Sequence, residues 1–123
     1  MKTKYFNDAV IGNDQILASY SKNGELLRLY YPTRDNKQFL DYFETGVKIN
    51  DSSLIYLHQD INNQYKQKYI EDTNILTTEI KNTYFNLKMV QTDFVPIKNN
   101  VLIKRYLFVN ENTINLDVKF FIN

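Results

Sequence analysis

The chain has 123 residues, a net charge of +1, one histidine and no cysteine. This length predicts a single domain, residues 1–123. The near-neutral charge gives no electrostatic reason to expect nucleic acid or an anionic membrane as a partner. The lack of cysteine excludes disulfides, thiol catalysis and cysteine-ligated metals, and a single histidine excludes a metal site built on two.

The composition favours strands, with ten tyrosines and eight phenylalanines but three glycines. Aromatic and β-branched side chains fit the pleated surface of a sheet. No apolar run approaches the length of a membrane span. Residues 1–10 lack the apolar run of a signal peptide, so we expect a cytoplasmic protein.

Turn signals divide the first half of the chain into hairpins. Gln15–Tyr20 and Glu25–Tyr31 flank Ser21–Gly24, which ends in Asn-Gly, the strongest short hairpin signal. Val47–Ile49 and Leu54–Leu57 predict a second hairpin around the four polar residues between them. Each pair is expected to form antiparallel strands.

The middle of the chain is less regular. Lys37–Phe43 could form one helical turn, because two phenylalanines lie four residues apart. Ile75–Ile80 predicts a strand with one apolar face. In Tyr84–Val95 the apolar positions change from odd to even near Met89–Val90, which predicts a β-bulge there.

The pattern in the last part of the chain predicts two further strands. Val101–Val109 is apolar on both faces apart from a Lys-Arg pair, which is typical of a central strand. Ile114–Ile122 alternates apolar and polar residues, as in a strand with one buried face. The total is about eight or nine strands, so the fold class is all-β, an antiparallel β-sandwich.

Several residue types could carry chemistry, and each has a simpler interpretation. His58 could be a general base, but no nucleophile motif accompanies it, so we interpret it as a surface or partly buried residue at a strand end. Two carboxylates could hydrolyse a glycosidic bond, although acidic residues along strands are usually solvated. The tyrosines could stack on sugars, but rims of a sandwich core are favoured because tryptophan is absent. The acidic candidates are Asp41, Glu44, Glu71, Asp72, Glu79 and Asp93.

Short segments in the same order resemble the N-terminal β-domain of bacterial and archaeal glucoamylases, glycoside hydrolase family 15. They are Ile11–Ala18, Asn23–Pro32, Phe43–Val47, Tyr69–Thr73, Asp93–Pro96 and Val101–Asn110. Each segment is short, so their order and spacing carry the resemblance, which implies part of a galactose-mutarotase-like supersandwich. Two features depart from the family: Gln59–Lys68 lacks the usual tryptophan, and the similarity ends near the middle of the family's domain.

The resemblance implies a non-catalytic, structural role. The family's catalytic glutamates lie in a helical toroid, to which no position here corresponds, so we expect no catalytic residue, metal or cofactor. The implied partner is that helical catalytic domain, in an enzyme that inverts the anomeric centre as it releases glucose from α-linked oligosaccharides. Pro32, Thr33, Arg34, Asp35 and Asn36 form a candidate loop facing the sugar or the helical domain, although an ordinary strand connection is favoured.

Two other functions and one assembly stay open. The chain could be a free-standing carbohydrate-binding β-sandwich, or the β-domain of a glycoside phosphorylase or mutarotase-like enzyme. Half of a supersandwich would leave the apolar row of Ile114–Ile122 uncovered, which predicts a two-fold homodimer through that row. Alternatively, the two halves of the chain close a small sandwich by themselves.

Overall fold

The computed structural model describes residues 8–32, 40 and 43–123. These residues form ten strands and no helix, and so contain no helix that could cross a membrane. The strands are β1 (Ala9–Gly12), β2 (Leu17–Tyr20), β3 (Leu26–Tyr30), β4 (Thr45–Ile49), β5 (Ile55–Tyr56), β6 (Asn63–Tyr69), β7 (Leu76–Asn82), β8 (Leu87–Phe94), β9 (Ile103–Asn110) and β10 (Val118–Ile122).

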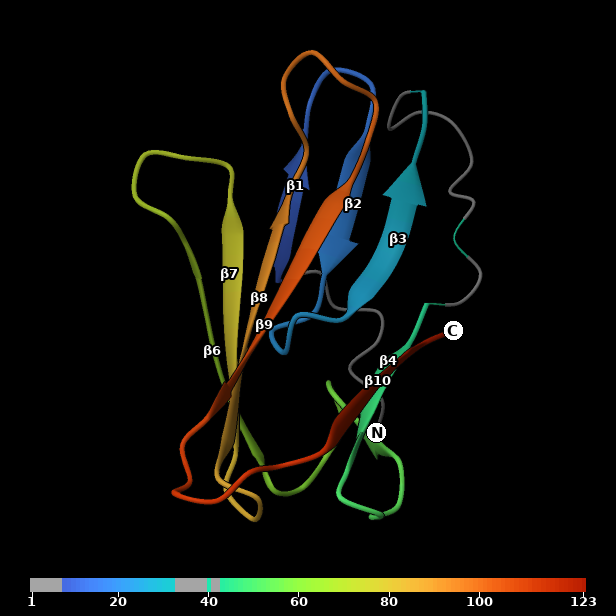
Figure 1. The fold of residues 1–123 in the computed structure, drawn as a ribbon. Coiled ribbons are helices and arrows are strands. Elements are labelled where there is room, and N and C mark those ends of the chain that lie inside the picture. The colour runs from blue at the N-terminus through green and yellow to red at the C-terminus, as the bar shows by residue number, and fades with distance from the viewer. Residues whose placement is uncertain (1–7, 33–39, 41–42) are drawn as a thin grey trace.

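The strands form one long sheet covered by two short ones (Figure 1). The long sheet has the order β6-β7-β8-β9, and the short sheets have the orders β1-β2-β3 and β10-β4-β5. Every pairing is antiparallel. The all-β antiparallel sandwich is therefore confirmed, with ten described strands in place of the eight or nine expected.

Each short sheet encloses its own apolar cluster against the long sheet. The first cluster joins the β1-β2-β3 sheet to Leu76 of β7 and to Val95 and Leu102 beyond β8 and before β9. The second cluster joins the β10-β4-β5 sheet to Ile80 and Met89. Strand β7 therefore contributes to both clusters, while β8 and β9 contribute to the second and are flanked by Val95 and Leu102 of the first.

Both predicted hairpins are confirmed. β2 pairs with β3, and Gly24 closes their turn with a φ of 86°, while its N–H donates to the Ser21 carbonyl at 3.0 Å. This backbone conformation favours glycine, because glycine has no Cβ atom to clash with the backbone. β4 pairs with β5, and Asn50 adopts a φ of 52° in the turn between them.

The β-bulge predicted near Met89–Val90 is wrong. β8 keeps an unbroken register with both β7 and β9, and its odd-numbered residues stay buried throughout. The pattern changed because Gln91 and Asp93 occupy two inward positions, while Val90 and Phe94 lie on the outer face. The register shift in the described strands lies between Ser19 and Tyr20, in β2.

Two predictions about the last strands also need correction. β9 is an edge strand of the long sheet within the described residues, so the expectation of a central strand is wrong there. In β10 and the segment before it, Leu116, Val118 and Phe120 pack on the second apolar cluster. The middle of the row expected to be uncovered is therefore packed within the chain, whereas Ile114 and Ile122 at its ends are 67% and 61% exposed, and the homodimer through this row stays a prediction. The helical turn predicted at Lys37–Phe43 lies largely outside the described residues.

Candidate functional site

A band of polar side chains crosses the inner face of the long sheet between its two apolar clusters. In register across the four strands lie Gln67, Thr78, Gln91 and Tyr106. Figure 1 shows the β2–β3 turn between the two short sheets, and Gln67 and Gln91 of this band bond to carbonyls of that turn. Buried carbonyl groups at such chain turns require hydrogen-bond donors. We call this row the polar belt.

The belt supplies donors to the β2–β3 turn. The amide nitrogen Nε2 of Gln67 donates to the Ser21 carbonyl at 2.9 Å. The Nε2 atom of Gln91 donates to the Gly24 carbonyl at 2.9 Å. The belt therefore holds the first short sheet onto the long one by directional bonds.

Next to the belt lies a buried ion pair between β8 and β9. Asp93 is fully buried, and its Oδ1 atom accepts from Lys104 Nζ at 2.7 Å. Its other oxygen, Oδ2, accepts from Gln91 Nε2 at 2.6 Å. The ammonium of Lys104 lies 5.1 to 5.7 Å from the ring centroids of three aromatic side chains, which adds favourable cation–π attraction. Those aromatic residues are Tyr20, Phe43 and Tyr106.

His58 extends this network toward β6. Its Nε2 atom lies 2.8 Å from Oε1 of Gln91, and because the Gln91 amide nitrogen serves two acceptors, Oε1 accepts and His58 Nε2 donates. His58 is buried, against the expectation of a surface or partly buried position. Asp60, two residues on, accepts from Asn62 N–H instead of orienting the imidazole ring.

Burial controls the protonation of these groups. Desolvation lowers the pKa of His58 to about 4, with a smaller contribution from the positive charge of Lys104. Desolvation also lowers the pKa of Lys104, while Asp93 opposes that change. Burial, followed by the charge of Asp93, raises the pKa of Tyr20 and Tyr106. At neutral pH His58 is therefore neutral and both tyrosines keep their protons.

This network is closed to a substrate. His58 and Asp93 are 6% and 0% exposed, and each already has a hydrogen-bond partner inside the sandwich. A general acid or base must reach the reacting proton directly or through one water. The network therefore acts on the fold, joining β8 and β9 to the loop before β6.

The acidic residues proposed as hydrolytic candidates do not gather in one site in the described part of the chain. Asp93 is buried with Lys104, and Glu79 faces Lys88 Nζ at 3.6 Å on the outer face of the sheet. Glu71 and Asp72 are exposed neighbours on the β6–β7 turn. Glu44 lies just before β4, and Asp41 falls outside the described residues.

One hollow in the described part of the chain is an open groove of about 720 Å³ at one end of the long sheet. Glu71 and Asp72 line it on one side, with Pro96 and Ile97 on another. The hydroxyl of Tyr69 is held in place because it accepts from Val10 N–H at 3.0 Å and donates to the Val10 carbonyl at 2.7 Å. A groove of this volume, with an aromatic ring and two carboxylates, has the size of small-molecule sites.

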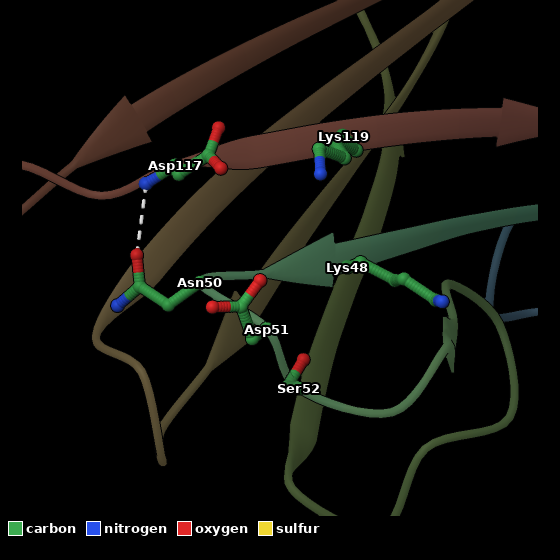
Figure 2. A pocket seen from close by; sticks show the side chains of 6 residues that line it. All are labelled: Lys48, Asn50, Asp51, Ser52, Asp117 and Lys119. Carbon is green, nitrogen blue, oxygen red and sulfur yellow. Dashed lines mark hydrogen bonds between the residues drawn. The ribbon is translucent and has the colours of Figure 1, made fainter.

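Two smaller hollows lie elsewhere. One, of about 150 Å³, lies where the β4–β5 turn meets the start of β10 (Figure 2). There Asn50 Oδ1 accepts from Asp117 N–H at 2.9 Å, and the Lys48 side chain extends away from both (Figure 2). This volume is below the usual range of ligand sites.

The second hollow, of about 380 Å³, includes Tyr31, the residue just before the predicted sugar-side loop in the sequence. It is lined by Ile16, Leu29, Tyr31, Asn100 and Leu102. Pro32, the first residue of that loop, is exposed. Thr33, Arg34, Asp35 and Asn36 lie outside the described residues, so the role of the loop stays a prediction.

Sequence reasoning missed the network around Lys104 and Asp93. One signal was present in the broken alternation of β8, where Gln91 and Asp93 stand at positions that continue the buried side of Leu87 and Met89. A second was Lys104, a charge within an otherwise apolar run. Together, two opposite charges on neighbouring strands at inward positions indicate an internal ion pair.

Comparison with known proteins gives one match. Over 112 residues the chain is 32% identical to an uncharacterized glycosyl hydrolase of Methanocaldococcus jannaschii. The match covers 91% of this chain but 17% of that protein, so the chain corresponds to a small part of its relative's length. No family model and no solved structure matches. The chain is therefore related to a glycosyl hydrolase at the level of one glycosidase-related domain.

Proposed function

We propose that the chain is a non-catalytic β-domain of a glucoamylase-type glycoside hydrolase. The observation that carries this proposal is the 112-residue match to a small part of a glycosyl hydrolase. The antiparallel sandwich agrees with the β-domain that the family resemblance implies. The substrates of the whole enzyme would be oligosaccharides with terminal α-linked glucose.

The distribution of carboxylates supports the non-catalytic role. Inverting hydrolysis needs two carboxyl groups about 6.5–9.5 Å apart, on opposite sides of the sugar. Among residues 8–32, 40 and 43–123, the buried Asp93 is neutralised by Lys104, and the other acids are dispersed over the surface. The acid and the base would come from a helical partner domain.

An activity assay tests the catalytic part of the proposal. We expect the purified chain to release no glucose from maltotriose, measured with a coupled glucose assay against a blank. If glucose is released, the Glu71→Gln and Asp72→Asn variants identify the source. Activity lost in either variant would overturn the proposal, and so would activity unchanged in both that stays with the chain through repeated purification.

A second candidate is a free-standing carbohydrate-binding domain. The groove beside Tyr69 favours it, because a ring of 43% exposure and neighbouring carboxylates could contact a sugar. A maltotriose titration followed by tyrosine fluorescence separates the two functions. The structural domain gives no saturable change, whereas a binding domain gives one that Tyr69→Ala removes and Tyr84→Ala, at another exposed tyrosine, leaves intact.

The reading frame of the gene provides a further test. A β-domain of this kind would be followed by helical periodicity carrying the catalytic glutamates. A stop codon directly after Asn123 would contradict a fused helical domain and favour the binding domain.

A further inference from the structure

The two edges of the long sheet differ sharply in chemistry. β6, at one edge, has the polar sequence NQYKQKY, with its outward positions occupied by glutamine and lysine. β9, at the other edge, has the sequence IKRYLFVN. Native proteins protect free sheet edges with charges, lysine above all. The β6 edge is adapted to water in this way, and the β9 edge is much less so.

The outer face of β9 adds an apolar strip to this edge. Ile103, Leu107 and Val109 are 38%, 43% and 38% exposed. Cross-strand pairing continues the strip onto β8, since Leu107 lies opposite Val90 and Ile103 lies opposite Phe94. Apolar residues that line a free edge mark a surface for strand pairing.

The second layer of the sandwich ends on the same flank. β10 is the edge strand of its sheet, and its residue Phe120 packs on Tyr106 and Phe108 of β9 with ring centroids 4.8 and 5.4 Å apart. Both layers therefore stop beside one another, at β9 and β10. A second copy of the chain presents the same two-layered flank, which makes the surface complementary to itself under a two-fold rotation.

We propose that β9 pairs antiparallel with β9 of a second copy, about a two-fold axis at Leu107. This register keeps outer residues opposite outer residues, as a period of two requires. It places Tyr106 opposite Phe108 of the second copy, an aromatic cross-strand pair of a favourable kind. The assembly joins two four-stranded sheets edge to edge, and it does not depend on any role in glycoside hydrolysis.

The charges of Arg105 and Glu111 favour this register over the register whose two-fold axis lies one residue away, at Tyr106. With the axis at Leu107, Arg105 lies diagonally across from Glu111 of the second copy, within reach of a long side chain. With the axis at Tyr106, the two copies of Arg105 would lie diagonally across from each other and repel. Both Arg105 and Glu111 are exposed, and Glu111 already pairs with Lys81 Nζ of its own chain, so Arg105 of the second copy would be a second cation beside that carboxylate.

Cysteine cross-linking tests the proposal, because the natural chain has no cysteine. We expect light scattering to give a mass of about twice 14.7 kDa at micromolar concentration. Leu107→Cys should form a disulfide-linked dimer on mild oxidation with diamide. Gln64→Cys on the β6 edge and Arg105→Cys, off the axis, serve as matched controls and should cross-link far less.

A charge variant supplies an independent readout. Leu107→Lys should raise the dissociation constant at least about tenfold, because two like charges would face each other at the axis. Gln64→Lys adds the same charge to the β6 edge and should leave the mass unchanged. A monomer at all concentrations would overturn the proposal and leave the flank to strands of a longer polypeptide. A dimer whose dissociation constant is unchanged in Leu107→Lys would also overturn the proposal. So would a disulfide-linked dimer that forms equally from Gln64→Cys and Leu107→Cys.

Discussion

The buried ion pair gives the sharpest test of the energetics of this sandwich. Replacing Lys104 by methionine keeps most of the side-chain length but leaves the fully buried Asp93 carboxylate without its cation. Breaking a buried pair by removing one partner costs about 3–5 kcal/mol. With a urea m-value of about 1.5 kcal/mol/M, a loss of about 3 kcal/mol lowers the unfolding midpoint by about 2 M.

The reverse change is expected to be milder. Asp93→Asn removes the carboxylate charge, which is 0% exposed. It leaves the Lys104 ammonium, whose side chain is 11% exposed and faces three aromatic rings. We expect a loss of about 1–3 kcal/mol, the cost of a weakened buried hydrogen bond. Combining the two substitutions leaves no buried charge, so the double variant should be more stable than Lys104→Met alone.

Urea unfolding followed by tyrosine fluorescence and circular dichroism measures these differences. Lys88→Met is the matched control, since Lys88 pairs with Glu79 at 3.6 Å on the surface and should contribute at most about 0.5–1 kcal/mol. If Lys104→Met does not fold, recovery of a folded double variant still reports the coupling. Equal losses for Lys104→Met and Lys88→Met, or a double variant no more stable than Lys104→Met, would refute the reasoning.

Two further predictions concern pH and backbone conformation. The pKa of His58 falls from its ordinary 6.5 to about 4 on folding. Between these pH values the unfolded chain therefore binds more protons than the folded chain, so the free energy of unfolding decreases on acidification. From pH 7.5 to 5 this decrease is about 2 kcal/mol. The His58→Gln variant lacks this titration, so the decrease in its free energy of unfolding from pH 7.5 to 5 should be smaller than that of the natural chain by about 2 kcal/mol. An identical pH dependence of the two proteins would contradict the burial argument. Gly24→Ala should cost about 2 kcal/mol, because φ is positive there and the new Cβ would lie 2.7 Å from Thr78 Oγ1. The matched Asp72→Gly change, at an exposed residue with a φ of 59°, should stay within about 1 kcal/mol in the same urea assay, and equal losses would count against the conformational explanation.

Features determined by neighbouring residues were predictable from the sequence. The Asn-Gly step before Glu25 predicts a hairpin because the turn conformation depends on a few consecutive residues. The alternation of Leu76 and Ile80 predicts the buried face of β7 for the same reason. Both predictions are confirmed, as is the fold class, because they rest on local turn chemistry and a two-residue period.

Features determined by residues far apart in the chain were not predictable from the sequence. The polarity of Gln91 and Asp93 suggested an outward face, because their partners are contributed by Gly24, His58 and Lys104 from other strands and loops. Sequence order alone likewise gives no indication that β10 pairs with β4, about seventy residues earlier, which places β9 at an edge. Both errors concern which segments meet, a property of the whole chain.

The position of the ion pair follows from the way the two short sheets share one long sheet. At the junction between them, turn carbonyls of Ser21 and Gly24 point into the sandwich and accept from Gln67 and Gln91. An apolar side chain in place of Gln91 would remove the donor to the buried Gly24 carbonyl, at a cost of about 1–3 kcal/mol. In place of Gln67 it would leave the Ser21 carbonyl with the Gly24 N–H alone. Once Gln91 donates to Gly24 and Asp93, the Asp93 charge needs a cation, and Lys104 on the neighbouring strand provides it. The polar belt thus arises from the hydrogen-bonding needs of the junction, and for that reason it lies between the two apolar clusters.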